Sequence, residues 1–311
     1  MQLHFLGTGA GMPSKERNTS ALMVKLLDEI GEMWLFDCGE ATQHQILRTS
    51  LKPRKVTKIF VTHLHGDHIF GLPGFLSSRS FQGGDEELTI FGPAGIQQWM
   101  EITLALSKTH LTYPLKFVEV NEGIVYEDAQ FVVRAGALRH VVPCFGYRIE
   151  QKDLPGELLI DKAQALGVPK GPLLGQLKNG RDITLDNGVI VRATDVVASP
   201  QKGFTLAILG DTKYCAEALA LAQGADIVVH EATFDGSTTE LAANYGHSTN
   251  REAATVASYA QARYLLLNHL SARFLPGDLP QFLAEAQAIF PQTYLTTDYA
   301  VFSWQNGELN D

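Results

Sequence analysis

Short runs of apolar and β-branched residues alternate with segments of helical periodicity along most of this chain. Strand-like runs cover residues 2–6, 21–27, 33–37, 58–62, 115–120, 130–135, 145–149, 205–209, 226–230 and 264–268. Helical segments are predicted at residues 40–48, 96–107, 214–223, 250–263 and 281–290. Strands and helices that alternate in one continuous pattern predict a layered α/β domain.

The pattern changes between about residues 150 and 182. Here Pro155-Gly156, Gly171-Pro172 and Asn179-Gly180 interrupt short apolar patches. Proline and glycine occur too often in this segment for core strands, and the segment is too apolar for a disordered one. We therefore expect one domain over residues 1–311 that carries an inserted, projecting arm at about 150–182.

The composition excludes only a few classes of function. The 311 residues are 45% hydrophobic and 19% charged, so the chain can bury a large core. It has no run of ~18 apolar residues, which argues against a membrane span. Three scattered cysteines suggest free thiols in a reducing cytoplasm. A formal charge of −9 disfavours nucleic-acid binding by bulk charge but leaves room for a local basic patch such as Lys52-Pro53-Arg54-Lys55.

The strand at 58–62 is followed directly by His63, His65, Asp67 and His68. In extended geometry the first two histidines share a face, and Gly66 permits a bend that turns the next two residues toward a nearby point. Three imidazoles and a carboxylate suit zinc, manganese or iron rather than calcium. The alternatives are a polar loop that happens to hold histidines, or a structural zinc site, which usually contains cysteine.

Three further residues, His140, Asp211 and His269, each follow an apolar strand directly or after a short loop. In a layered α/β fold such strand ends converge on one edge, where sites are usually built. Two metals need a bridging ligand, and a carboxylate with two oxygens, such as Asp211, can supply it. Each residue alone could equally be a capped turn or a surface histidine.

Several motifs together resemble a known family. A strand that ends in HxHxDH resembles the metallo-β-lactamase superfamily. The remaining motifs resemble ribonuclease Z, the tRNA 3′-processing endonuclease, in its short form and over essentially the whole chain. They are Pro13-Ser14-Lys15-Glu16-Arg17-Asn18, the FDCGEATQ segment at 36–43, His230-Glu231-Ala232-Thr233, Gly246-His247-Ser248-Thr249, and the arm with its tip at Gly171-Pro172.

This resemblance implies an αβ/βα sandwich with two Zn²⁺ ions per chain. One zinc would be held by His63, His65 and His140, the other by Asp67, His68 and His269, with Asp211 between them. Asp67 would also act as general base. His247, held by Glu231, would protonate the leaving oxygen, although Glu231 could instead be a buried structural carboxylate.

The resemblance also implies the substrate and the partners. The enzyme would cleave precursor tRNA 3′ of the discriminator nucleotide, in the cytoplasm and as a homodimer. The expected substrate-binding residues are Lys15, Arg17, Arg273, Lys170, Gly171 and Pro172. Two alternatives remain at this point: a small-molecule hydrolase of the same fold, and a metal-stabilised RNA-binding protein without turnover.

Overall fold

The computed structural model describes residues 1–311 and divides them into two compact units. The first unit comprises residues 1–126, 133–149 and 205–311, and the second comprises 127–132 and 150–204. The segment expected as an arm at 150–182 belongs to the second unit, which continues beyond it to residue 204.

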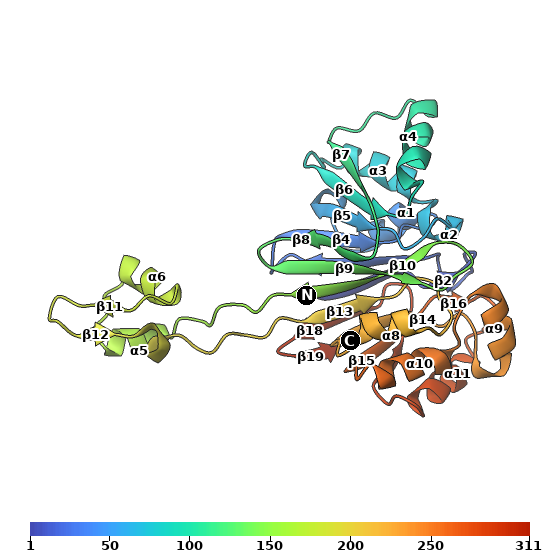
Figure 1. The fold of residues 1–311 in the computed structure, drawn as a ribbon. Helices are drawn as coiled ribbons and strands as arrows, with labels where there is room; N and C mark the ends of the chain where they lie inside the picture. Colours follow the sequence, from blue (N-terminus) through green and yellow to red (C-terminus); the bar gives the residue numbers. More distant parts are fainter. The chain divides into compact units, whose positions relative to one another are not determined.

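Two large sheets dominate the structure (Figure 1). The eight-stranded sheet has the order β19-β18-β1-β3-β4-β5-β6-β7, and the seven-stranded sheet has the order β17-β15-β14-β13-β10-β9-β8. The strands of the first are β1 Gln2–Gly7, β3 Ala21–Leu26, β4 Glu32–Phe36, β5 Val56–Phe60, β6 Leu88–Gly92, β7 Leu115–Glu119, β18 Val301–Gln305 and β19 Glu308–Asn310. The strands of the second are β8 Gly123–Glu127, β9 Phe131–Leu138, β10 Cys144–Gln151, β13 Thr205–Ile208, β14 Ile227–Glu231, β15 Tyr264–Asn268 and β17 Thr293–Leu295. Two short strands, β2 Gly9–Ala10 and β16 Leu270–Ser271, pair in parallel.

Helices of the first unit cover the outer faces of the sheets (Figure 1). On the first sheet lie α1 Thr42–Leu47, α3 Leu72–Phe81 and α4 Ile96–Leu106, and their apolar side chains share a core with β1, β3, β4, β5 and β6. On the second sheet lie α8 Ala216–Ala222, α10 Asn250–Tyr259 and α11 Leu279–Gln287. The remaining helices are η1 Pro53–Lys55, α2 Gly66–Ile69, η2 Gly236–Thr238 and α9 Thr239–Tyr245. The predicted layered α/β architecture is confirmed.

An aromatic layer joins the inner faces of the two sheets. Phe36, Phe60 and Phe91, on the adjacent strands β4, β5 and β6, stack with centroid separations of 4.9 and 4.7 Å. Tyr147 on β10 meets Phe60 edge-on at 5.2 Å. Aromatic pairs of this kind contribute about 0.5–1.5 kcal/mol each beyond the area that they bury. The layer therefore fixes the spacing between the sheets whose ends carry the chemistry.

The parallel strands of both sheets end near one another. Strands β4 to β7 run parallel in the first sheet, and β13, β14, β15 and β17 run parallel in the second. The carboxyl end of β5 leads into His63, that of β13 into Asp211, and that of β15 into His269. Residues from distant parts of the sequence are thus delivered to a common edge.

Some predicted elements differ from those in the structure. The strand before the histidines is β5, Val56–Phe60, so the strand ends before Thr62 rather than at it. The helix predicted to run to residue 263 ends at Tyr259. Helix α3 and strand β6 were not predicted. Helix α3 carries a proline and a glycine in its first turn, which lowers its helical propensity.

The second unit has a small core of its own. It contains α5 Ile160–Ala165, α6 Pro172–Lys178, α7 Ala193–Val196 and the hairpin of β11 Ile183–Thr184 with β12 Ile190–Val191. Its buried apolar residues are Ala163, Val168, Leu177, Ile183, Leu185, Val191, Ala193 and Val196. None of the helices in the structure has the length and apolar character required to cross a membrane.

Candidate metal centre

The segment after β5 carries four of the predicted ligands and turns sharply at Gly66. This residue begins the short helix α2, which directs Asp67 and His68 inward, where both are buried. A Cβ on Gly66 would lie 2.2 Å from the ring of Phe70. Glycine thus lets the Phe70 ring lie close to the backbone here, and its φ is not in the left-handed region.

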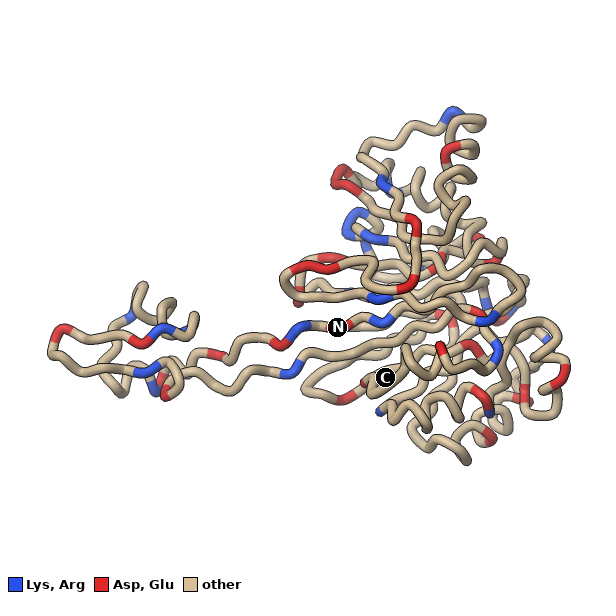
Figure 2. Tube along the Cα trace, in the orientation of Figure 1, with Lys and Arg blue, Asp and Glu red and all other residues tan.

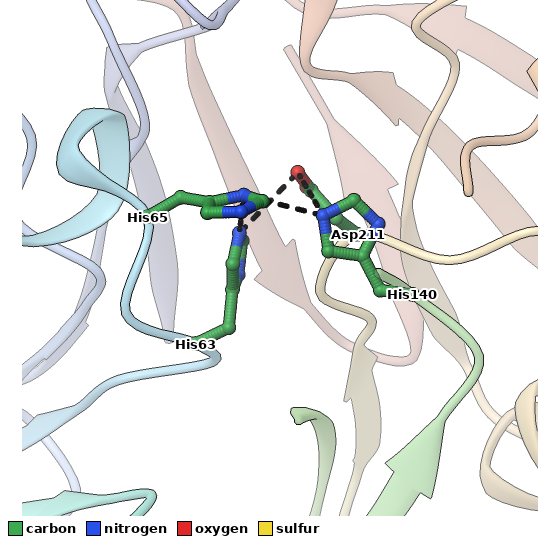
Figure 3. A group of neighbouring side chains, drawn as sticks. All are labelled: His63, His65, His140 and Asp211. Atoms are coloured by element: carbon green, nitrogen blue, oxygen red, sulfur yellow. Dashed lines mark hydrogen bonds and ion pairs between the residues drawn. The ribbon is translucent and has the colours of Figure 1, made fainter. Parts of the chain in front are cut away.

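A first group of side chains consists of His63, His65, His140 and Asp211 (Figure 3). His65 Nδ1 lies 3.0 Å from His63 Nε2 and 3.3 Å from His140 Nε2. The Oδ2 atom of Asp211 lies 3.5 Å from His63 Nε2. Three ring nitrogens and one carboxylate oxygen thus converge on one point.

A second group consists of Asp67, His68 and His269. His68 Nε2 lies 3.2 Å from His269 Nε2, and Asp67 Oδ2 lies 3.3 Å from the same His269 nitrogen. Asp211 also approaches this group, with Oδ1 3.5 Å from His269 Nε2 and Oδ2 3.5 Å from His68 Nε2. The carboxylate of Asp211 therefore lies between the two groups, as expected of a shared ligand.

Outer hydrogen bonds fix which nitrogen of each ring faces inward. His68 Nδ1 bonds to Asp37 at 2.8 Å, His269 Nδ1 to the hydroxyl of Thr233 at 2.9 Å, and His140 Nδ1 to the Gly246 carbonyl at 2.8 Å. The Nε2 atoms of these rings are therefore left for the interior. Such outer partners orient metal-binding histidines and tune their basicity.

Sequence reasoning missed Asp37 and Thr233. Both lie in segments quoted for the family resemblance, which was a signal that could have identified them. Asp37 has a positive φ of 55°, and its carboxylate also accepts from the amide and hydroxyl of Thr62. A strained backbone that persists under several hydrogen bonds is typical of functional sites.

Burial and mutual charge set the protonation of the cluster. Burial, aided by the charge of His68, lowers the pKa of His63 to about 2, which keeps that ring neutral and able to bind a metal. Burial alone would raise the pKa of Asp211, but His269, His68 and His63 together hold it well below its usual range. Burial would likewise raise the pKa of Asp67, and hydrogen bonds from His269 and His68 lower it. Burial would lower the pKa of His68, but the charges of Asp211 and Asp37 raise it well above its usual value. A divalent cation requires neutral imidazoles and ionised carboxylates, so a metal bound at the second group would displace the proton of His68.

The donor set fits transition-metal ions. All seven residues predicted as ligands lie in the two groups, and the candidate ligand atoms within each group lie within 4.8 Å of one another. Mixed imidazole and carboxylate donors suit zinc, manganese or iron. The buried Cys144, whose Sγ lies 3.7 Å from His63 Nδ1, touches the outer nitrogen of that ring rather than the convergence point.

His247 and Glu231 adjoin the metal groups. Glu231, at the end of β14, is buried, and its carboxylate accepts from His247 Nδ1 at 2.9 Å and from the amides of Thr212 and Ser248. Burial alone would lower the pKa of His247, but the charge of Glu231 and this hydrogen bond raise it to about 9. His247 is therefore protonated at neutral pH, and its Nε2 is the nitrogen that can meet a substrate. Glu231 thus holds His247 and also accepts hydrogen bonds from two buried backbone amides.

The predicted substrate-binding residues are placed differently from one another. Lys15 is exposed and, with Arg17 and Leu275, lines a cavity of about 450 Å³. Arg17 itself is buried, and its Nη1 donates to Thr8 Oγ1 and to the Thr296 carbonyl, so it supports the loop. Arg273 is exposed and lies over the ring of Phe234.

The other three predicted substrate-binding residues belong to the second unit. Lys170, Gly171 and Pro172 are all exposed at the start of α6. Gly171 has a φ of 145°, which favours glycine, and Pro172 occupies the first helical position. The Gly-Pro pair therefore sets the entry into α6.

Comparisons with known proteins agree with this geometry. A family model described as "Anti-Pycsar protein Apyc1" matches residues 1–130. Ribonuclease Z of Anoxybacillus flavithermus is 52% identical over 303 residues, covering 97% of each chain. Ribonuclease Z of Geobacillus kaustophilus is 51% identical and covers 99% of this chain and all of the relative.

Solved structures agree as well. The crystal structure of human tRNase Z, short form, superposes with a TM-score of 0.70 at 30% identity, covering 97% of this chain and 99% of that one. The metallo-β-lactamase-fold protein YhfI from Bacillus subtilis, at 20% identity and a TM-score of 0.66, shares the fold. The predicted metallo-β-lactamase αβ/βα fold is thereby confirmed, and the chain belongs to the ribonuclease Z family.

Proposed function

We propose that this protein is a zinc-dependent endoribonuclease that cleaves precursor tRNA 3′ of the discriminator nucleotide. The cut leaves a 3′-hydroxyl on the tRNA and a 5′-phosphate on the trailer. The observation that carries the proposal is the pair of candidate metal-binding groups with Asp211 between them and the His247–Glu231 pair beside them. Membership of the ribonuclease Z family supports the choice of substrate.

Zinc would be held by His63, His65 and His140 on one side, by Asp67, His68 and His269 on the other, and by Asp211 between them. Two bound ions would supply a nucleophile by acidifying a water and would offset negative charge on the phosphate oxygens. The residues of the chain then move the protons.

Asp67 would accept the proton of the attacking water, since its carboxylate lies in the second metal group, beside the expected position of that water. Its Oδ2 also accepts a 2.7 Å hydrogen bond from the amide of Gly11, which holds the carboxylate in place. His247 donates a proton from Nε2 to the departing 3′ oxygen as the bond from phosphorus to that oxygen breaks. Glu231 keeps His247 protonated and oriented.

The second unit acts as the tRNA-binding arm in this proposal. Lys162, Lys170, Lys178 and Arg181 lie in a stretch without an acidic residue, although charges of both signs are interspersed in the chain as a whole (Figure 2). Contacts far from the cut convert binding energy into positioning of the scissile phosphate. The cluster at Lys52–Lys55 is a second basic surface. It precedes β5, whereas the metal loop follows that strand, so the two lie roughly 17 Å apart at 3.3 Å per residue.

A homodimer is also part of the proposal. Ile102 and Leu106 lie one turn apart on α4, and the ring of Phe70, which follows α2, lies 6.4 Å from that of Trp99 on α4. Phe70, Ile102 and Leu106 are all more than half exposed. Such side chains are typical of an interface between copies. Sedimentation of wild-type protein and of Leu106→Glu tests this, and a monomer in both would contradict it.

The activity is tested with one precursor tRNA and end-group mapping of its products. We expect a single cut 3′ of the discriminator, abolished by a chelator and restored by zinc, with about two metal ions per chain by elemental analysis. Hydrolysis of lactams or thioesters without RNA cleavage would favour the small-molecule alternative. RNA binding without cleavage would favour the inert alternative.

A further inference from the structure

An exposed tyrosine stands beside the proposed proton donor. Tyr245 is the last residue of α9 and is 60% exposed. The chain then turns at Gly246, whose φ is 75°, and reaches His247. A Cβ on Gly246 would lie 3.0 Å from His140 Nδ1, so the turn is packed directly against the metal groups. The position of Tyr245 relative to His247 is therefore fixed by a tight turn.

Other groups hold this aromatic ring in place. Phe234 is buried, and its ring lies nearly parallel to that of Tyr245, with an interplanar angle of 18° and a centroid separation of 6.5 Å. The guanidinium carbon of Arg273 lies 4.6 Å from the Phe234 ring centroid, and the ring of His247 lies 6.0 Å from it. An exposed aromatic ring with a rigid aromatic and cationic support is the arrangement on which proteins stack unpaired bases.

We propose that Tyr245, supported by Phe234 and Arg273, stacks on the base of the discriminator nucleotide. The inference rests on the function proposed above, in which His247 protonates the 3′ oxygen of that same nucleotide. A base and its own 3′ oxygen are joined through one sugar, so the base lies within reach of residues next to His247. Because every base has a π-face, this contact positions the nucleotide without selecting its identity.

The test compares variants of Tyr245 with a matched control. Tyr245→Ala is expected to lower kcat/KM for precursor tRNA by roughly 5- to 150-fold, the range for losing one stacked base. Tyr245→Phe and Tyr245→Trp keep an aromatic face and retain most of the wild-type value. Tyr259→Ala, at a similarly exposed tyrosine (66%) ending α10, changes nothing. Metal content and thermal melting show whether each variant is folded.

The RNA provides the second half of the test. For the wild type, an abasic discriminator should lower kcat/KM by about the same factor as Tyr245→Ala does on the normal precursor. On the abasic precursor, Tyr245→Ala should lower kcat/KM no further, since both changes remove the same contact. Two factors that multiply, or a folded Tyr245→Ala with wild-type kcat/KM on the normal precursor, would overturn the inference. If the wild type itself fails to cut precursor tRNA, the proposed function fails instead.

Discussion

The metal centre and the second unit use charged side chains in opposite ways. At the centre, Asp67, Asp211 and Glu231 are buried, and each has several fixed partners. In the second unit, Lys170 and Lys178 are exposed, and no ion pair fixes either of them. A buried carboxylate is stable only with its partners in place, whereas an exposed cation is stable in water and can meet a phosphate without a fixed geometry.

The cost of a single substitution should therefore differ between the two regions. A change at the centre leaves other buried groups without a partner, and its cost is large. A change in the second unit removes one of several similar contributions.

The largest effect is expected at Asp211. Asp211→Asn keeps the size of the side chain but removes the charge shared by both metal groups. We expect metal content to fall at both and cleavage to fall by at least ~10³-fold, because several kcal/mol of transition-state stabilisation depends on the bound metals. The control is Asp186→Asn, the same change at an exposed carboxylate of the second unit. Normal metal content in Asp211→Asn would contradict the shared-ligand role.

A smaller effect is expected at His247. His247→Ala should lower kcat for precursor tRNA by ~10²-fold or more, the lower range for general acid–base catalysis, while metal content stays normal. Bis(p-nitrophenyl) phosphate should be affected less, because its leaving group is stable as an anion and needs no proton. Equal losses on both substrates would mean that His247 does not serve the leaving oxygen.

The same comparison explains what the sequence alone could predict. His63, His65, Asp67 and His68 are adjacent in the chain, so their convergence follows from local geometry. His140, Asp211 and His269 could be found because each follows a strand, and strand ends meet at one edge. The pairing of Asp37 with His68 joins residues 31 positions apart and depends on sheet register, which local patterns do not encode.

Other details depended on packing. Arg17, a predicted phosphate contact, is buried against Thr8 and Thr296, a placement that no local pattern reveals. The short helices α5 and α6 were not predicted, since helices of six or seven residues gain their stability from tertiary contacts rather than propensity. Ala163 and Leu177 supply such contacts in the core of the second unit.

Removing the second unit should affect substrate binding more than chemistry. Leu154 and Gln201 exchange two backbone hydrogen bonds of 2.9 and 3.0 Å, so residues 155–200 can be replaced by an Asn-Gly turn at this pair. We expect KM for precursor tRNA to rise by ~10- to 100-fold and its salt dependence to weaken, because phosphate contacts are lost. Hydrolysis of bis(p-nitrophenyl) phosphate should persist. If kcat/KM falls equally for both substrates, the unit is structural. If kcat/KM falls for neither substrate, another surface holds the tRNA.

The smallest effect is expected from one exposed cation of the second unit. Lys178 ends α6 and lies in the stretch that holds Lys162, Lys170 and Arg181 without an acidic residue. If it contacts one phosphate, Lys178→Ala should raise KM only a few-fold and reduce the slope of log KM against log salt by about 0.7–0.9, the value for one released counterion. Lys178→Arg should restore the slope, since charge rather than shape is what this position supplies. Lys108→Ala, at an exposed lysine two residues after α4 in the first unit, is the control and should change neither quantity. A loss as large as that of Asp211→Asn would mean that the second unit relies on fixed, buried charge in the same way as the metal centre, and the contrast between the two regions would be wrong.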